Sequence, residues 1–341
     1  MATNRRVLVC GWSGAGNVGD ELLTRAAIAL AAEAGIKPVV LSVDHERTRH
    51  HHPEVEVVTR GVRSLLTLAN CDAVWIGPGG IIQDSSSVWS LPMHVTPALV
   101  ARIRGRSVIG VGLGADPLRR RSSRWLLARA LRTQPVTVRD PASQAVLAQA
   151  GIHSEIDCDL AVEILAPRAL GASSGVTVAV GPNAAPGRIR RGRDRLVSDS
   201  ADDIATLVDR VADRVGGPVR AVLFRGERDR AMADDIAART RHSVTVDDDP
   251  ATAVDAVWNA AAVVTSRYHA ALVGAIGGAT VVAHRGQAKL RSLINDPIVG
   301  DRMVGLDRWD QPLPDRWPTP GTGVVPHRTG ANRAAVASLG A

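Results

Sequence analysis

The feature that most constrains the fold is a twice-repeated alternation of short apolar runs with helical stretches. Runs of this kind, separated by helices, are typical of parallel strands that are buried on both faces of a sheet. The first series predicts strands at 6–10, 38–43, 73–77, 107–112, 136–139 and 155–158, and helices at 21–34, 97–104, 123–131 and 142–150.

A second series of the same kind follows a break at residues 166–175. It predicts strands at 176–180, 219–224, 243–246, 261–265 and 280–283, and helices at 201–215, 229–239, 252–259 and 270–276. Alternation of this type gives α/β domains with helices on both faces of the sheet. We therefore expect two Rossmann-like domains facing a cleft, at residues 1–168 and 176–300. Residues 301–341 are expected to form a tail in which 331–339 could be a final helix.

The charge of the chain suits anionic ligands. Its 341 residues carry 41 Lys and Arg against 34 Asp and Glu, a net charge of +7, and nearly all the basic residues are arginine. The one dense run, 188–195, lies in a Gly-rich segment with almost no aromatic residues nearby. Nucleic-acid-binding proteins usually combine such charge with stacking rings or a recognisable module. We therefore expect no nucleic-acid partner, and a solvated loop or one near an anionic substrate or membrane surface.

Several absences in the sequence bear on location and on metals. The N-terminus does not resemble a signal peptide, and no apolar run reaches bilayer-spanning length. Three cysteines, without metal-ligand spacing, fit a reducing cytoplasm. His45 and His50–His52 lack acidic or cysteine counterparts at ligand spacing, so a solvated loop is expected there rather than a metal site.

The most informative motif is the turn at residues 265–270, Thr-Ser-Arg-Tyr-His-Ala, between a predicted strand and a small-residue helix. Ligands of open α/β sheets lie outside the carboxyl ends of the strands. The N-terminus of a helix there offers free N–H groups and positive potential. Arg267 and His269 at this position predict an anion site with a proton carrier beside it.

The first predicted strand leads into a glycine loop, 11–21, which contains a G-x-G-x-x-G match at residues 14, 16 and 19. Taken alone, this pattern is a dinucleotide fingerprint. Asp20 and Glu21, however, would repel a pyrophosphate at the start of the helix. The loop is better suited to holding hydroxyl groups or to orienting a partner side chain.

Three further segments carry side chains that could bind a ligand or cap a helix. In the loop 77–85, Gln83 and Asp84 offer hydrogen bonds to sugar hydroxyls, although Asp84 alone could equally be a helix cap. In the turn 136–143, Asp140 is expected to cap a helix that begins with Pro141. Lys289, one of only two lysines, is expected to contact a ligand because its compact ammonium is not equivalent to an arginine fork.

Taken together, these motifs resemble the polysaccharide pyruvyl transferase family. The matching segments are G-N-V-G-D-E at 16–21, G-P-G-G-I-I-Q-D at 77–84, G-V-G-L-G-A-D-P at 110–117, V-R-D-P-A-S at 138–143, S-R-Y-H-A at 266–270, and the lysine at 289. Their order and spacing agree with the family from about residue 7 to residue 295.

The resemblance implies a GT-B-like fold, with the N-terminal domain on the acceptor side and the C-terminal domain on the donor side. It implies transfer of pyruvate from phosphoenolpyruvate to a sugar diol of a polysaccharide or glycan precursor, giving a ketal and phosphate. No cofactor or metal is expected. The acceptor could be lipid-linked, and a cytoplasmic enzyme could associate peripherally with the inner face of the membrane.

The resemblance and the chemistry together assign roles to nine residues. Proton transfer is assigned to His269, with Asp20 as a second catalytic candidate. Arg267, Lys289 and Ser266 are expected to bind the donor, and Asn17, Glu21, Gln83 and Asp84 the acceptor.

The chain departs from the family pattern at two places. It reads Gly181-Pro182-Asn183 where members often have an arginine, and Arg225-Gly226-Glu227-Arg228 where they often have a histidine. Arg188, Arg190 or Arg225 could supply the missing anion contact. The alternatives are a GT-B-type glycosyltransferase using a nucleotide sugar, a nucleotide-dependent oxidoreductase, and a non-catalytic sugar-binding relative.

Overall fold

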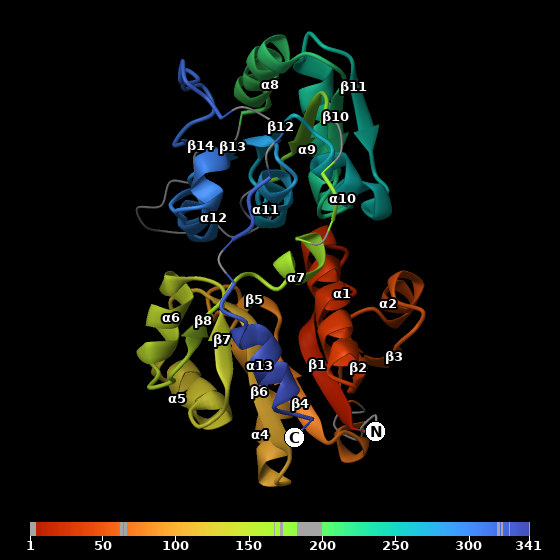
Figure 1. Cartoon of the computed structure of the whole chain (residues 1–341), viewed down its shortest axis with the longest axis vertical. Coiled ribbons are helices and arrows are strands. Elements are labelled where there is room, and N and C mark those ends of the chain that lie inside the picture. Colours follow the sequence, from red (N-terminus) through yellow and green to blue (C-terminus); the bar gives the residue numbers. More distant parts are fainter. Residues whose placement is uncertain are drawn as a thin grey trace. The chain divides into compact units, whose positions relative to one another are not determined.

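A computed structural model describes residues 5–61, 64, 67–166, 168–170, 173–182, 200–318, 321, 323–326 and 328–340 (Figure 1). The chain forms two compact units. Unit 1 comprises residues 1–16, 20–164 and 327–341, and unit 2 comprises residues 17–19 and 165–326. The expected tail is thus divided, since residues 301–326 belong to unit 2 and the rest to unit 1.

Unit 1 is built on a parallel sheet in the order β3-β2-β1-β4-β6-β7-β8, with β5 paired to β6. The strands are β1 (Arg6–Ser13), β2 (Lys37–Ser42), β3 (Glu56–Thr59), β4 (Ala73–Ile76), β5 (Gly79–Ile82), β6 (Ser107–Ala115), β7 (Val136–Val138) and β8 (Glu155–Ile156). All four residues of β4 are buried, as a central strand covered on both faces requires.

Most helices of this part of the chain connect successive strands. The helices are α1 (Val18–Glu33), α2 (His45–His51), α4 (Ser90–Ile103), α5 (Arg121–Leu131), α6 (Pro141–Ala148), α7 (Val162–Leu165), the short 3-10 helix η1 (Leu68–Asn70) and the C-terminal α13 (Ala331–Ala337). Helix α7 instead leads to unit 2, and α13 follows the last strand. Leu91, Val95 and Ala98 of α4 pack with Leu127 and Leu131 of α5 in the core.

Unit 2 repeats the design with a six-stranded parallel sheet in the order β11-β10-β9-β12-β13-β14. Its strands are β9 (Val176–Ala179), β10 (Val219–Val222), β11 (Val244–Asp247), β12 (Ala262–Thr265), β13 (Thr280–His284) and β14 (Met303–Leu306). Its helices are α8 (Ala201–Val215), α9 (Glu227–Arg239), α10 (Pro250–Trp258), α11 (Tyr268–Ile276), α12 (Ala288–Ile294) and η2 (Val299–Arg302). None of the helices in the described parts of the chain combines the length and hydropathy that a bilayer span requires.

Several elements differ from the sequence-based expectation. The polar stretch at His45, expected as a solvated loop, forms α2, because the Asp44 side chain accepts a hydrogen bond from Arg47 N and caps it. Residues 79–82, expected as a loop, form β5. Helix α4 begins at Ser90, seven residues earlier than predicted, and contains Pro97. The predicted series also lacked β3, α12 and β14.

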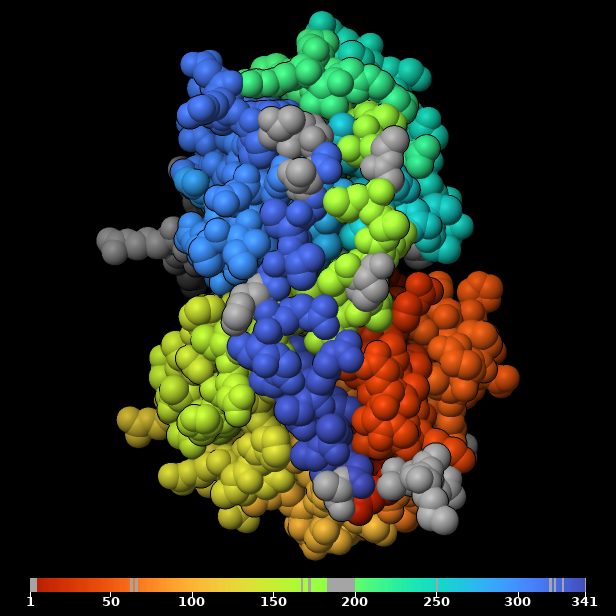
Figure 2. Space-filling model, in the orientation of Figure 1, coloured from red at the N-terminus to blue at the C-terminus, as the bar shows by residue number. Residues whose placement is uncertain are grey.

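The C-terminal helix α13 is tied into unit 1 by buried hydrogen bonds. Asn332 is fully buried; its Nδ2 donates to the carbonyl of Cys158, and its Oδ1 accepts from Thr137 Oγ1 at 2.6 Å. Its backbone N–H donates to Asp157. In the space-filling view the blue C-terminal segment lies across unit 1, between the red and the yellow-green segments (Figure 2). The last helix is therefore part of the folded core of unit 1.

We predict that Asn332→Ala lowers the free energy of unfolding by about 2 kcal/mol, because it leaves buried polar groups of Thr137 and Cys158 without their partner. Urea unfolding followed by circular dichroism measures the change. Ala337→Ser, at an exposed position of the same helix, should stay within about 0.5 kcal/mol of the wild type. Equal stability of all three proteins would show that α13 does not contribute to the core.

Candidate functional site

The candidate donor site of unit 2 lies at the point where the strand order reverses. Strands β9 and β12 are neighbours at the centre of the sheet, and their connections proceed in opposite directions, toward β10 and β13. A crevice at such a switch point is the usual ligand site of an open parallel sheet. The loops that leave it here begin at Val180 and Ser266.

Ser266 fastens the two strand ends together. It is buried, and its Oγ lies 3.3 Å from both the N and the O of Gly181. Its carbonyl accepts a hydrogen bond from Gln287 Nε2, at the start of α12. The position predicted as a donor contact thus holds the loop after β9 and the start of α12 against the end of β12.

Arg267, the residue before α11, is paired with a carboxylate that the sequence analysis did not identify. Its Nε and Nη2 donate to the two oxygens of Asp229, which is fully buried in the first turn of α9. A methyl group at Gly181 would collide with both members of this pair. The pair therefore fills the space that a side chain at residue 181 would need.

This contact joins the two departures from the family pattern into one arrangement. Gly181 stands in the first of them, and Asp229 directly follows the second. A glycine at the end of β9 and an acidic residue at the start of α9 together let the Arg267 guanidinium lie over the strand end. The signal in the sequence was that the arginine expected near Gly181 and the histidine expected near residues 225–228 are both absent. The sequence analysis treated these two departures separately.

His269 lies in the first turn of α11, two residues after Arg267. Its ring meets that of Tyr268 edge-on, with centroids 5.1 Å apart. Within unit 2, Gly19 packs so closely on the imidazole that a methyl group at Gly19 would collide with Nδ1. The same segment is fixed by a 2.9 Å hydrogen bond from Val18 N to the carbonyl of Phe224. Gly19 of the glycine loop is thus needed beside the candidate proton carrier.

Three further predicted site residues lie at the starts of helices. Asn17 Oδ1 accepts from Gly19 N at 3.1 Å, at the start of α1. Asp20 is in the first turn of α1 and lies near Gly79 in unit 1, since a methyl group there would be 4.0 Å from its Oδ1. Lys289 is exposed in the first turn of α12. Asp20 of the glycine loop therefore lies near Gly79 of the segment 77–85, within unit 1.

Glu21 has a structural partner rather than an open carboxylate. Its Oε1 accepts from Gly14 N at 2.8 Å, and its Oε2 lies 3.5 Å from Nε2 of the buried His52. The Arg47 guanidinium occupies the space beside Gly16. The expectation of a solvated loop is therefore wrong for His52. A dinucleotide pyrophosphate would have to displace the Gly14–Glu21 bond.

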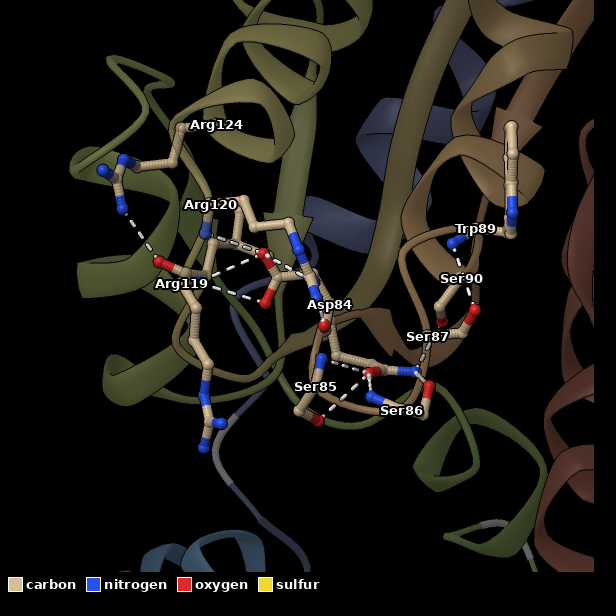
Figure 3. Close-up of polar contacts among 11 residues, drawn as sticks. Asp84, Ser85, Ser86, Ser87, Trp89, Ser90, Arg119, Arg120 and Arg124 are labelled. Carbon is tan, nitrogen blue, oxygen red and sulfur yellow. Dashed lines mark hydrogen bonds and ion pairs between the residues drawn. The ribbon is translucent and has the colours of Figure 1, made fainter.

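Gln83 organises the serine-rich loop that follows β5. Its Nε2 donates to the hydroxyls of Ser86 and Ser90, and its Oε1 accepts from Ser85 and Ser86 (Figure 3). The amide is thus occupied within its own loop. The serine hydroxyls, rather than Gln83, form the outer polar edge of this loop.

Asp84 anchors the loop that precedes α5. Its buried carboxylate accepts hydrogen bonds from the backbone N–H groups of Arg119 and Arg120, at 2.9 to 3.1 Å (Figure 3). Burial alone would raise its pKa, but these hydrogen bonds hold the pKa of Asp84 below its usual value. This geometry favours a positioning role over a direct contact with an acceptor.

The turn at residues 136–143 has the capping role expected of it. The Asp140 side chain accepts from Ser143 N, and Pro141 opens α6. Arg139 is buried over Gly114 and Gly80, and its Nη1 donates to Asp159 at 3.1 Å. The guanidinium lies beside Gly80 of β5 and Gly114 near the end of β6, where the glycines leave room for it.

An aromatic cluster at the end of β1 was not anticipated. The Trp12 ring lies 5.1 Å from the ring of buried His94 and under the Arg60 guanidinium. Burial and the neighbouring Arg60 lower the pKa of His94 to about 3, so the imidazole is neutral. The only signal in the sequence was an aromatic residue directly after Gly11. A partly exposed indole beside the glycine loop is a suitable surface for a sugar ring.

Some predicted features lie outside the described residues, namely Asn183 and the arginine run 188–195 with Arg188 and Arg190. Among the residues that the structure describes, no group of three His, Cys, Asp or Glu side chains is arranged to hold a metal ion.

We predict that Gly181→Ala destabilises the protein by about 1–3 kcal/mol, because the new methyl group must displace the buried Arg267–Asp229 pair. Thermal and urea unfolding measure the effect. Gly80→Ala is the matched control, since its methyl group would meet nothing closer than 3.7 Å. If the two substitutions had the same small effect, the pair would not fill the end of β9.

Comparison with known proteins assigns the fold. Solved structures with the same architecture include a UDP-GlcNAc 2-epimerase from Methanocaldococcus jannaschii, with TM-score 0.58 and 9% identity over 97% of this chain and 98% of that one. A putative UDP-N-acetylglucosamine 2-epimerase from Listeria monocytogenes has a TM-score of 0.56 and 10% identity, over 85% of this chain and 81% of that one. HepE of Anabaena, in complex with UDP and glucose, has a TM-score of 0.51 and 14% identity, over 90% of this chain and 87% of that one. These likenesses confirm the predicted fold class of two GT-B-like parallel-sheet domains.

No curated protein sequence matches the chain significantly. The family model described as polysaccharide pyruvyl transferase matches residues 17–283, well over half of the sequence. This range includes the glycine loop from Asn17, the turn around Arg267 and His269, and the Asp229 segment. The chain therefore belongs to the polysaccharide pyruvyl transferase family of transferases.

Proposed function

We propose that the protein transfers pyruvate from phosphoenolpyruvate to two hydroxyl groups of a glycan, forming a ketal and releasing phosphate. The family supports a transferase that acts on a glycan. The observation that carries the donor assignment is the placement of Arg267 and His269 at the switch point of unit 2, at the start of α11.

Phosphoenolpyruvate carries a phosphate and a carboxylate, and both suit this end of unit 2. The N-terminus of α11 presents backbone N–H groups and positive potential to an anion. Asp229 takes Nε and one N–H of Nη2 of Arg267, and the other N–H groups of the fork can donate to donor oxygens. Lys289, in the first turn of α12, supplies a second cation from a neighbouring helix.

The pairing with Asp229 changes what Arg267 can contribute. A guanidinium beside a buried carboxylate is partly neutralised, so its attraction for an anion is weaker than that of an isolated arginine. The fork is also held in one orientation, which lowers the entropy lost when a donor is bound. Arg267 therefore acts chiefly by directing hydrogen bonds, and the helix and Lys289 supply more of the positive potential.

His269 is assigned proton transfer. The reaction adds one proton to the methylene carbon of the donor and two hydroxyl oxygens to its central carbon, while the phosphate leaves with its bridging oxygen. One hydroxyl proton balances the new methyl group, and the other leaves with the phosphate. An imidazole titrates near neutral pH and can accept and return such a proton. Gly19 packs against the Nδ1 edge of the His269 ring, so the ring has no room to turn toward Gly19.

Unit 1 is assigned the acceptor. Asp20 lies near Gly79 of β5 and is our candidate to hold or activate an acceptor hydroxyl. Asn17, which directly precedes α1 and belongs to unit 2, is also assigned to acceptor binding. Trp12 and the serines organised by Gln83 provide an aromatic face and hydroxyl groups at the same sheet edge. Glu21 and Asp84 act indirectly. Glu21 fixes the glycine loop, and Asp84 fixes the loop before α5.

The rival proposals are less well supported by the contacts. A nucleotide-sugar glycosyltransferase is suggested by the UDP-sugars named for the structural neighbours, but identities of 9 to 14% support the fold alone. An oxidoreductase would need the Gly14 amide that Glu21 already engages. Pyruvyl transfer uses the turn at 266–269 and follows the family.

We predict that His269→Gln lowers kcat by about 10²- to 10⁴-fold with little change in donor affinity, because the amide cannot transfer the proton. Phosphate release from phosphoenolpyruvate in the presence of candidate glycans measures turnover. His242→Gln, on the surface of unit 2, should keep full activity. Normal turnover with a raised KM would instead make His269 an anion ligand, and the acid would then be sought at Asp20.

A further inference from the structure

The outer faces of α4 and α5 hold an unusual share of the exposed apolar surface of the protein. Seven large apolar side chains of the described residues are exposed, and five of them lie between residues 88 and 125. They are Val88, Trp89, Met93, Ile103 and Trp125, with Ile103 86% exposed, Trp89 73% and Trp125 64%. Single exposed apolar residues are common, but such clustering marks an interaction surface.

Three of these side chains belong to α4 or to its N-cap. Trp89, at the N-cap, and Met93 and Ile103 of the helix are exposed, while Val95, Ala98 and Ala101 face the core. The helix therefore also exposes large apolar side chains to solvent. In Figure 3 the Trp89 indole points away from the polar contacts of the Gln83 loop.

Helix α5 lies against α4 and presents arginine with tryptophan. Arg121, Trp125 and Arg129 are spaced by four residues and are all exposed. The two helices are linked near their C-terminal ends by Arg102, which donates to the carbonyl of Arg129 at 2.7 Å. Apolar side chains and guanidinium groups are therefore both exposed on these two neighbouring helices.

The charge of the same segment is strongly one-sided. Residues 85–135 contain nine of the 41 basic residues, all arginine, and one of the 34 acidic residues, Asp116. The segment thus carries a net charge of +8. The rest of the chain, with 32 basic and 33 acidic residues, is close to neutral. The positive net charge of the protein is therefore the charge of the α4–α5 segment.

We propose that the outer surface of α4 and α5, the α4–α5 face, docks on an anionic lipid bilayer. Helices that lie in a membrane interface combine apolar and tryptophan side chains with arginines that meet lipid phosphates. Nucleic acid would also attract the arginines, but it offers no surface for Met93 and Ile103, which cannot stack on bases in the way that aromatic rings do. Both helices begin at the carboxyl edge of the sheet, so the docked face borders the Gln83 loop. The docking itself is independent of the proposed reaction.

The test is co-sedimentation of the full chain with vesicles of phosphatidylcholine, with and without phosphatidylglycerol. We expect binding to the anionic vesicles and little binding to the neutral ones, with a marked loss as salt rises from about 0.1 M to about 1 M. Arg121→Gln with Arg129→Gln should weaken binding about 25-fold, at about fivefold for each arginine near an anionic surface. Ile103→Ser with Trp125→Ser should weaken it about tenfold or more.

The matched control is Val325→Ser with Arg316→Gln, which removes an exposed apolar and an exposed basic side chain from unit 2. It should bind vesicles like the wild type, and circular dichroism should show that every variant is folded. The proposal is overturned if the chain ignores anionic vesicles, or if the α4–α5 variants bind as the control does. It is also overturned if the chain binds a DNA duplex as well as it binds anionic vesicles and the apolar substitutions leave the DNA binding unchanged. Conversion of a dimer into a monomer by these substitutions would assign the face to a second copy of the chain instead.

Discussion

Strands β9 and β12 pair in parallel, with Val176 opposite Ala262 and Ala179 opposite Thr265, and so they end side by side. Because the chain leaves these two ends in opposite directions, the space above them is not filled by a crossover connection. Ser266 closes the gap between the strand ends, and the Arg267–Asp229 pair lies directly above. The position of His269 follows, since the helix that carries it must start where β12 stops.

The Arg267–Asp229 pair depends on a third residue at the end of the neighbouring strand. Burying the Asp229 carboxylate is costly, and the fork from Arg267 offsets that cost only while both members are present. Gly181 is required for the pair to fit. The three residues therefore form one unit. A change at any of them is expected to disturb the geometry at the start of α11.

The pattern of neighbouring residues in the sequence made the place of the Arg267 turn predictable. The turn around Arg267 lies between an all-apolar strand and a helix of small residues, so its place at a strand end could be inferred from neighbours in sequence. Asp229 is 38 residues from Arg267 and carries no local sign of its partner. Asp84 was interpreted as an acceptor ligand because it follows a glycine loop, yet its partners are backbone amides 35 and 36 residues away. Contacts between distant segments decide the roles of such polar side chains, and one sequence does not specify them.

The central claim is that the switch point of unit 2 binds phosphoenolpyruvate. Titration calorimetry of the full chain with phosphoenolpyruvate, and separately with UDP, tests it most directly. We expect binding of phosphoenolpyruvate and none of UDP. Arg267→Lys, which keeps the charge but loses the fork, should weaken binding about tenfold. Binding of UDP without phosphoenolpyruvate, or undiminished phosphoenolpyruvate binding by Arg267→Lys, would contradict the account.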